Sequence, residues 1–158
     1  IDVLINNASF PGERKPISEY SEAVWEQVLR ANATGPFLVA KEVLRACMLR
    51  QKSGLIINIS SGVGRVGKAN WGAYAVSKFA LEGLSQGMAR DFAGQGLISV
   101  TVNPDATRTT MRAEAYPQED PATLKTPEDF ARSLVEFMKT ISPADSGRSF
   151  DYGDLKNR

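Results

Sequence analysis

Four short apolar runs, separated by longer segments of helical periodicity, restrict the fold of this chain more than any other feature. The runs are VLINN, GLIINIS, ISVTVNP and, less strongly, RSFDYGD, at residues 3–7, 54–60, 98–104 and 148–154. Strands that alternate with helices in this way form βαβ units and a parallel sheet. At 158 residues the chain fits one domain with an ordinary core. The sequence therefore predicts a single α/β domain over residues 1–158.

Three helical segments separate or follow these strands. The first is expected from about Ser21 to Met48, with a break or kink at Gly35-Pro36, because proline removes a hydrogen bond from a helix interior. The second is expected over roughly 74–92. The third has a clear start, because Thr126 is suited to the N-cap position and is followed by proline and two acidic residues.

The composition excludes several classes of protein. The chain has 19 basic and 18 acidic side chains, so a basic surface for nucleic acid is not expected. No apolar run approaches the roughly 20 residues needed to cross a bilayer, which favours a cytoplasmic protein. The chain contains no histidine, which excludes a Ser-His-Asp triad, a Cys-His pair and histidine-bearing zinc sites. Proton transfer would have to use tyrosine, lysine, a carboxyl group or a hydroxyl relay.

Gly62, Gly64 and Gly67 form the pattern G-x-G-x-x-G directly after the second apolar run. One interpretation is a dinucleotide-binding turn, in which a helix begins within the glycines and an acidic residue follows about 20 positions later. The residues KANWG after Gly67 start a helix poorly, and Asp91 falls inside a helical segment. The glycines are better interpreted as bends of a loop that carries Ser61 at the carboxyl end of a strand, where ligands of α/β sheets bind.

Tyr74 and Lys78 lie four residues apart in the second helical segment. This spacing places both side chains on one face, where the ammonium group would lower the pKa of the phenol and make it usable as an acid and base. Taken alone, the pair is equally consistent with a solvated surface pair.

Several further segments, taken together with this pair, resemble the short-chain dehydrogenases and reductases. NNA after the first strand resembles the Asn-Asn-Ala-Gly segment of that family, the asparagine in RANATGPF resembles its helix-breaking catalytic asparagine, and Ser61 precedes Tyr74 by the family's 13 residues. VTVNPDATRTTM resembles its Asn-Pro-Gly segment. TTMRAEAYPQEDPATLKTPEDF is similar to a bacterial branch of uncharacterised oxidoreductases.

The resemblance implies hydride transfer between a nicotinamide and a small carbonyl or secondary alcohol. Ser61 would bind the substrate oxygen and Tyr74 would exchange its proton. Lys78 would hold the cofactor ribose and lower the pKa of the phenol, and Asn32 would position a water that links Lys78 to solvent. Thr109 would bind the nicotinamide carboxamide. The implied catalytic residues are Asn32, Ser61, Tyr74 and Lys78, and the implied cofactor-binding residues are Asn6, Asn7, Ala8, Tyr74, Lys78, Pro104 and Thr109.

The resemblance also implies a Rossmann-like three-layer sandwich, of which this chain would supply only the fourth to seventh strands. The family's glycine-rich cofactor motif is absent, so the choice between NAD and NADP is open. VLINN would become an exposed apolar edge. Two residues depart from the family pattern: Ser9 replaces a glycine, and Asp105 replaces the glycine of Asn-Pro-Gly. An aspartate can adopt the left-handed backbone that a glycine tolerates, but its carboxylate would be unfavourable near a phosphate-bearing cofactor.

Partners are expected to be a small-molecule substrate and further copies of the chain, as a homodimer or homotetramer. The alternative hypothesis is a catalytically inactive fragment that acts as a folded dimerisation or interaction module. Val66, Trp71 and a surface loop over 109–125 would shape the substrate pocket. The acidic residues of that loop are interpreted as a solvated face rather than a metal site: Glu114, Glu119 and Asp120.

Overall fold

A computed structural model describes residues 1–157 and contains a four-stranded parallel sheet in the order β1-β2-β3-β4. The strands are β1 (Val3–Asn6), β2 (Gly54–Ile59), β3 (Leu97–Asn103) and β4 (Ser149–Asp151). Each of the four apolar runs forms a strand, and each neighbouring pair is parallel. The predicted α/β fold with a parallel sheet is therefore confirmed.

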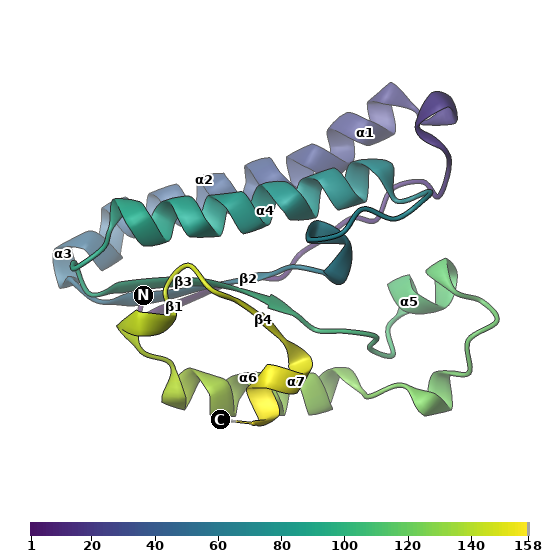
Figure 1. The fold of residues 1–158 in the computed structure, drawn as a ribbon. Coiled ribbons are helices and arrows are strands. Elements are labelled where there is room, and N and C mark those ends of the chain that lie inside the picture. The colour runs from purple at the N-terminus through teal and green to yellow at the C-terminus, as the bar shows by residue number, and fades with distance from the viewer. Residues whose placement is uncertain (158) are drawn as a thin grey trace.

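Helices cover the sheet on both faces, so that the molecule has three layers (Figure 1). On one face lie α1 (Glu22–Leu29), α2 (Gly35–Val43), α3 (Leu49–Gln51) and α4 (Gly72–Asp91), and on the other lie α6 (Pro127–Thr140) and α7 (Tyr152–Lys156). The helix α5 (Thr110–Ala115) extends beyond the carboxyl ends of the strands. Among the described residues, none of the helices combines the length and the apolar character needed to cross a membrane.

The alternation of side chains along β2 divides the core into two clusters. Leu55, Ile57 and Ile59 pack with residues of β3 and with Leu134 and Phe137 of α6. Ile56 points to the opposite face and joins a cluster from α2, α4 and the segment between α2 and α3. Successive residues of a strand face opposite sides, so a strand covered on both faces needs apolar residues at consecutive positions. The run LIINI meets this requirement except at Asn58, whose side-chain oxygen accepts a hydrogen bond from Asn6.

Of the break or kink expected at Gly35-Pro36 in the first predicted helix, the break does not occur. The helix continues through a π-helical turn at Arg30–Thr34, with Pro36 in the first turn of α2. Proline has no N–H group to donate to the carbonyl four residues earlier. The wider turn shifts the pattern by one residue, so that the N–H of Gly35 bonds to the carbonyl of Arg30, and the chain absorbs the proline without a break.

The other helices agree closely with the sequence. The predicted helix over 74–92 is α4, and Thr126 caps α6 in a capping box with Asp129. The segment 109–125 was expected to be a long surface loop, and this was wrong in part, because it contains α5 and a 3₁₀ turn at Pro121–Thr123. The hydroxyl of Thr109 accepts a hydrogen bond from the backbone N–H of Arg112 at 3.2 Å and thereby starts α5.

The strand β1 lies at an edge of the sheet, and within residues 1–157 it pairs only with β2. Its apolar side chains are partly open to solvent, with Val3 42% and Ile5 41% exposed. The sequence-based expectation of an exposed apolar edge is confirmed for the described residues.

Candidate active site

A cavity of about 720 Å³ lies at the carboxyl ends of β1, β2 and β3, bordered by α4 and α5. In a parallel sheet this edge collects the loops that follow each strand. Most of the predicted site residues line the cavity: Asn7, Ala8, Ser61, Tyr74, Lys78, Pro104 and Thr109. Asn6 and Asn32 do not appear among its lining residues.

Tyr74 and Lys78 stand one turn apart on α4, as the spacing predicted, and both are buried in the wall of the cavity. Tyr74 is 8% exposed and Lys78 is 2% exposed. The Nζ atom of Lys78 lies 5.4 Å from the centre of the Tyr74 ring and donates a hydrogen bond to the carbonyl oxygen of Ile59 at 2.8 Å. The alternative of a solvated surface pair is therefore wrong.

The pKa of the Tyr74 phenol is raised above its usual value because the group is buried. The hydroxyls of Ser9 and Ser61 oppose this shift by hydrogen bonding, which places both hydroxyls at the phenol. The expectation that Lys78 lowers the pKa of Tyr74 is not met in this structure. The ammonium group is directed to the carbonyl of Ile59 instead, and desolvation of the phenol dominates.

Burial lowers the pKa of Lys78 to about 8, from an ordinary value of 10.5. The negative charge of Glu82, one turn further along α4, partly opposes this shift. The negative charge of Glu82 therefore helps the buried ammonium group of Lys78 to keep its proton near neutral pH.

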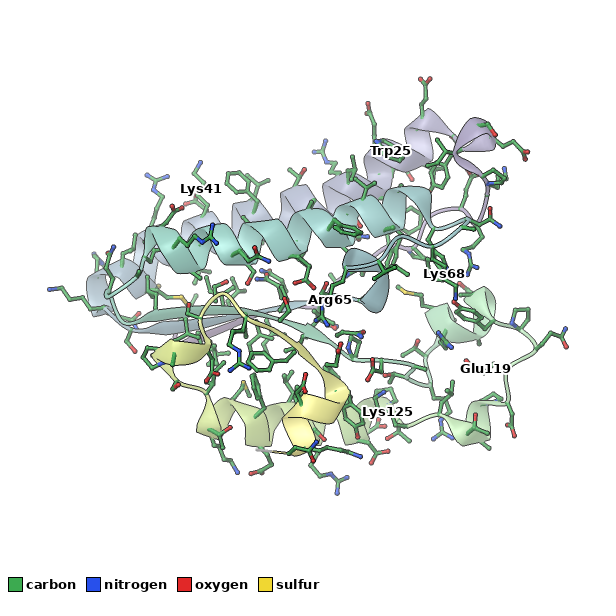
Figure 2. All side chains as sticks on the ribbon, viewed as in Figure 1. Trp25, Lys41, Arg65, Lys68, Glu119 and Lys125 are labelled. Atoms are coloured by element: carbon green, nitrogen blue, oxygen red, sulfur yellow. The ribbon has the colours of Figure 1, made fainter. Side chains whose placement is uncertain are left out.

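Glu82 itself belongs to a polar network that joins α4 to β3, β4 and the loop after β2. One carboxylate oxygen accepts hydrogen bonds from Thr101 at 2.6 Å and Ser149 at 2.5 Å. The other carboxylate oxygen pairs with Arg65, which is labelled in Figure 2, at 3.3 Å. Arg65 also pairs with Asp151 at 2.7 Å. Because each partner comes from a different element, the network fixes the loop after β2 against the rest of the site.

The three glycines after β2 do not open a helix. Gly62–Gly64 form a 3₁₀ turn, and α4 begins only at Gly72, so the interpretation as a loop that carries Ser61 is confirmed. Of the three, only Gly64 is required for close packing. A Cβ atom there would lie 2.8 Å from the Cβ of Lys78 and 2.9 Å from its backbone carbonyl carbon.

We expect Gly64→Ala to lower the free energy of unfolding by about 1–3 kcal/mol, because the added methyl group must displace the backbone of α4 at Lys78. Gly67→Ala is the matched control, since a Cβ atom there has no neighbour within 4 Å. Urea unfolding followed by circular dichroism measures both. Equal stability of the two variants would show that the approach of the loop to α4 is not tight.

Asn32 is buried in the π-helical turn, and its side chain is committed to the protein. Its amide nitrogen donates to the carbonyl oxygen of Phe10 at 2.8 Å and to the hydroxyl of Ser77 at 3.0 Å, and its oxygen accepts from the N–H of Phe10 at 2.7 Å. Asn32 therefore joins the loop after β1 to α4. Asn6 is similarly occupied, since it donates to Asn58 on β2 at 2.8 Å.

Asp105 adopts the left-handed backbone that an aspartate in a glycine position can adopt, with φ +53°. Its carboxylate accepts a hydrogen bond from the side chain of Asn103 at 2.8 Å, and its N–H donates to the same side chain at 3.1 Å. This local turn holds Asp105 at the rim of the cavity.

The predicted pocket residues Val66 and Trp71 line the cavity. Five residues of 109–125 also line it: Thr109, Met111, Arg112, Ala115 and Tyr116. Sequence reasoning missed Lys68, which lines the cavity, and Arg14, whose guanidinium lies 3.9 Å from the centre of the Trp71 ring. The position of Lys68 beside the glycine loop was a signal that could have been used. No local pattern predicts Arg14, because its partners lie more than fifty residues away in the chain.

A model of the short chain dehydrogenase family matches residues 1–120 of the chain. The uncharacterized oxidoreductase YciK of Escherichia coli (strain K12) is 40% identical over 151 residues, which are 96% of this chain and 59% of the relative. The 3-oxoacyl-[acyl-carrier-protein] reductase FabG of Vibrio cholerae is 33% identical over 124 residues, 78% of this chain and 50% of the relative. The chain thus spans half to three fifths of the length of these relatives.

Two solved structures resemble the chain closely. A short chain dehydrogenase from Escherichia coli CFT073, complexed with NADPH, gives a TM-score of 0.89 at 40% identity and covers 96% of this chain and 62% of that chain. One from Shigella flexneri 2a, complexed with NADP, gives a TM-score of 0.84 at 38% identity, over 97% of this chain and 63% of that chain. The family match begins at residue 1, so it does not support the expectation that the chain is only a C-terminal part of the family.

Proposed function

Because the chain belongs to the short chain dehydrogenase family, we propose that its protein is an NAD(P)-dependent oxidoreductase that interconverts a carbonyl compound and an alcohol. One observation carries the proposal: Ser61, Tyr74 and Lys78 line the same cavity at the carboxyl ends of the strands. No histidine is needed for this chemistry, because a phenol carries the proton. The domain assignment, residues 1–158 as one Rossmann-like unit, is part of the same proposal.

The lining of the cavity suits a polar cofactor. Within residues 1–157, the hydroxyl of Ser60 and the indole N–H of Trp71 are buried without a hydrogen-bond partner, and both residues line the cavity. Buried polar groups normally have partners, so these atoms suit a polar ligand. Asn7, Ala8, Pro104 and Thr109 would contact the cofactor, and Lys78 would hold a ribose hydroxyl. When bound, a reduced nicotinamide supplies the hydride.

The protonation state of Tyr74 favours reduction of a carbonyl. With its pKa raised by burial, the phenol keeps its proton across the neutral range and can donate it to the substrate oxygen. Ser61, whose hydroxyl lies at the phenol, would hold the same oxygen. Lys78 would bear positive charge below about pH 8 and stabilise the phenolate that remains.

The proposed role of Asn32 is narrower. Its side chain has both amide hydrogens donated within the protein, so it would support the site by fixing the loop after β1 to α4. Positioning of a water beside Lys78 by Asn32 stays a prediction.

Cofactor titration tests the proposal. We expect NADPH to bind the whole protein with saturation, detected by a change in nicotinamide fluorescence, and to bind more tightly than NADH, because the two complexed relatives hold NADPH and NADP. We also expect benzaldehyde, used as a probe, to accelerate NADPH oxidation. A protein that binds neither nucleotide would support the alternative hypothesis of a catalytically inactive interaction module.

Exposed apolar side chains on α2 and α4 support the expected homodimer or homotetramer. Phe37, Leu38 and Val39 on α2 and Val76 and Phe79 on α4 are all open to solvent. A symmetric interface would bury such residues on both copies. Assembly and a cytoplasmic location both stay predictions.

A further inference from the structure

An aromatic wall leads from the buried candidate acid Tyr74 to the half-buried Tyr116 beside the exposed Lys68, and we call this outer end the mouth of the cavity. The ring of Trp71 lies 5.3 Å from that of Tyr74 and 6.2 Å from that of Tyr116, measured between ring centres. All three residues line the cavity and belong to one apolar cluster. A substrate whose carbonyl lies at Tyr74 would therefore extend its apolar part along Trp71 toward Tyr116.

Three cationic side chains gather at the Tyr116 end of this wall. The guanidinium of Arg112 lies 3.9 Å from the centre of the Tyr116 ring, that of Arg14 lies at 5.4 Å, and the ammonium of Lys68 lies at 5.3 Å. Lys68 also donates a hydrogen bond to the Tyr116 hydroxyl at 3.0 Å. Figure 2 shows Lys68 facing the α5 region, with Glu119 on the loop beyond it.

These cations come from three separate segments, which the fold brings together. Arg14 belongs to the loop after β1, Lys68 to the loop before α4, and Arg112 to α5. Arg14 is held there by a hydrogen bond to the carbonyl oxygen of Ala115 at 3.3 Å, and by its position over Trp71.

The charges of this group are not balanced within the described part of the chain. Glu119 neutralises Arg112 through two hydrogen bonds of 2.6 Å. Within residues 1–157, neither Arg14 nor Lys68 takes part in an ion pair of 4.0 Å or less. The ring of Tyr116 attracts cations but carries no net charge, so the mouth of the cavity keeps two uncompensated positive charges.

We infer that the substrate carries an anionic group, a carboxylate or a phosphate, that binds at this mouth between Lys68 and Arg14. Both groups have oxygen atoms that accept charge-assisted hydrogen bonds from ammonium and guanidinium donors. The substrate class is thus a carbonyl compound with an apolar body and an anionic end. The carbonyl group of this substrate rests on the proposed function. The anion site rests on the positions and charges of Arg14 and Lys68.

The ionisation of Tyr116 is consistent with a positive field. Burial alone raises the pKa of this phenol, but the hydrogen bond from Lys68 and the charges of Lys68, Arg112 and Arg14 outweigh burial, so the pKa is lowered overall. A field that favours a phenolate at this point also favours a bound carboxylate or phosphate.

Isothermal titration calorimetry on the whole protein, without nucleotide, tests the inference with small probes. We expect phenylacetate to bind about tenfold more tightly than its neutral analogue phenylacetamide. Lys68→Met should weaken phenylacetate about tenfold and leave phenylacetamide unchanged. Lys15→Met is the matched control, because it removes the same charge from an exposed lysine that follows Arg14 in the chain and already pairs with Glu13. It should leave both affinities unchanged.

Phenyl phosphate, titrated in the same way, identifies the group that the site prefers. Weaker binding of the tighter of the two anions to Lys68→Met supports the inference, whichever anion that is. Equal binding of phenylacetate and phenylacetamide to the parent protein, or equal anion binding to parent and Lys68→Met, would overturn the inference. Because no nucleotide is present, failure of the proposed oxidoreductase activity would leave these affinities unaffected, and the two results can be told apart. Circular dichroism confirms that Lys68→Met is folded.

Discussion

Tyr74→Phe is expected to lower turnover by about 10²–10⁴-fold, because a general acid contributes that much and phenylalanine cannot donate a proton. The fold should remain intact. The ring keeps its packing against Trp71, and the loss of one hydroxyl should change the free energy of unfolding by no more than about 1 kcal/mol. The measurement is the rate of NADPH oxidation with benzaldehyde, together with urea unfolding.

Tyr152→Phe is the control for this variant. It removes the same hydroxyl from a tyrosine outside the lining of the cavity, so turnover should not change. If Tyr74→Phe kept the parent rate, the proton would have to come from another group, and the assignment of Tyr74 as the acid would be wrong.

Lys78→Met is expected to have opposite effects on activity and stability. Turnover should fall by at least about 10²-fold, because the positive charge beside the phenol is lost. Stability at pH 7 should rise by roughly 1–3 kcal/mol, because burial disfavours the ammonium group strongly enough to lower the pKa of Lys78 to about 8. The lost hydrogen bond to Ile59 offsets part of this gain.

The gain in stability of Lys78→Met over the parent protein should become smaller as the pH rises. Between about pH 8 and 10.5 the unfolded chain holds a proton on Lys78 that the folded chain has released. Stability of the parent protein therefore rises with pH in this range, and the advantage of Lys78→Met shrinks. Urea unfolding at pH 7, 9 and 10.5 measures this. Lys139→Met, at an exposed lysine on α6, should show neither effect. A gain that stays constant with pH would mean that packing, not charge, is responsible.

Local signals were sufficient to predict much of this molecule from its sequence. The Thr126 cap of α6 and the spacing of Tyr74 and Lys78 each depend on residues within a few positions, and the structure agrees with both. The four strands were recognisable because burial on both faces requires runs of apolar residues. The left-handed backbone of Asp105 is compatible with the sequence but was not predicted from it, because aspartate adopts other backbone conformations as readily.

The features that the sequence did not predict depend on contacts between distant residues, or on a choice between two backbone conformations that the same residues allow. The π-helical turn before Pro36 was missed because a helix can absorb a proline by shifting its hydrogen bonds, and the residues alone do not say which solution is adopted. The direction of the pKa shift of Tyr74 depends on burial and on where Lys78 points, and spacing on a helix gives neither. The cluster of Arg14 and Tyr116 joins residues about a hundred positions apart.

The helix α4 carries Tyr74, Lys78 and Glu82 in steps of four residues, while the surfaces that would touch the body of a substrate come from the segment before α4 and from α5. The helix α5 is thereby separate from the reacting groups, whereas the segment before α4 also carries Ser61. Duplicated genes with this architecture can acquire new substrate preferences through changes in α5, which leave the reacting groups in place. Changes in the segment before α4 are more restricted, because Trp71 packs against Tyr74 and Gly64 packs against Lys78.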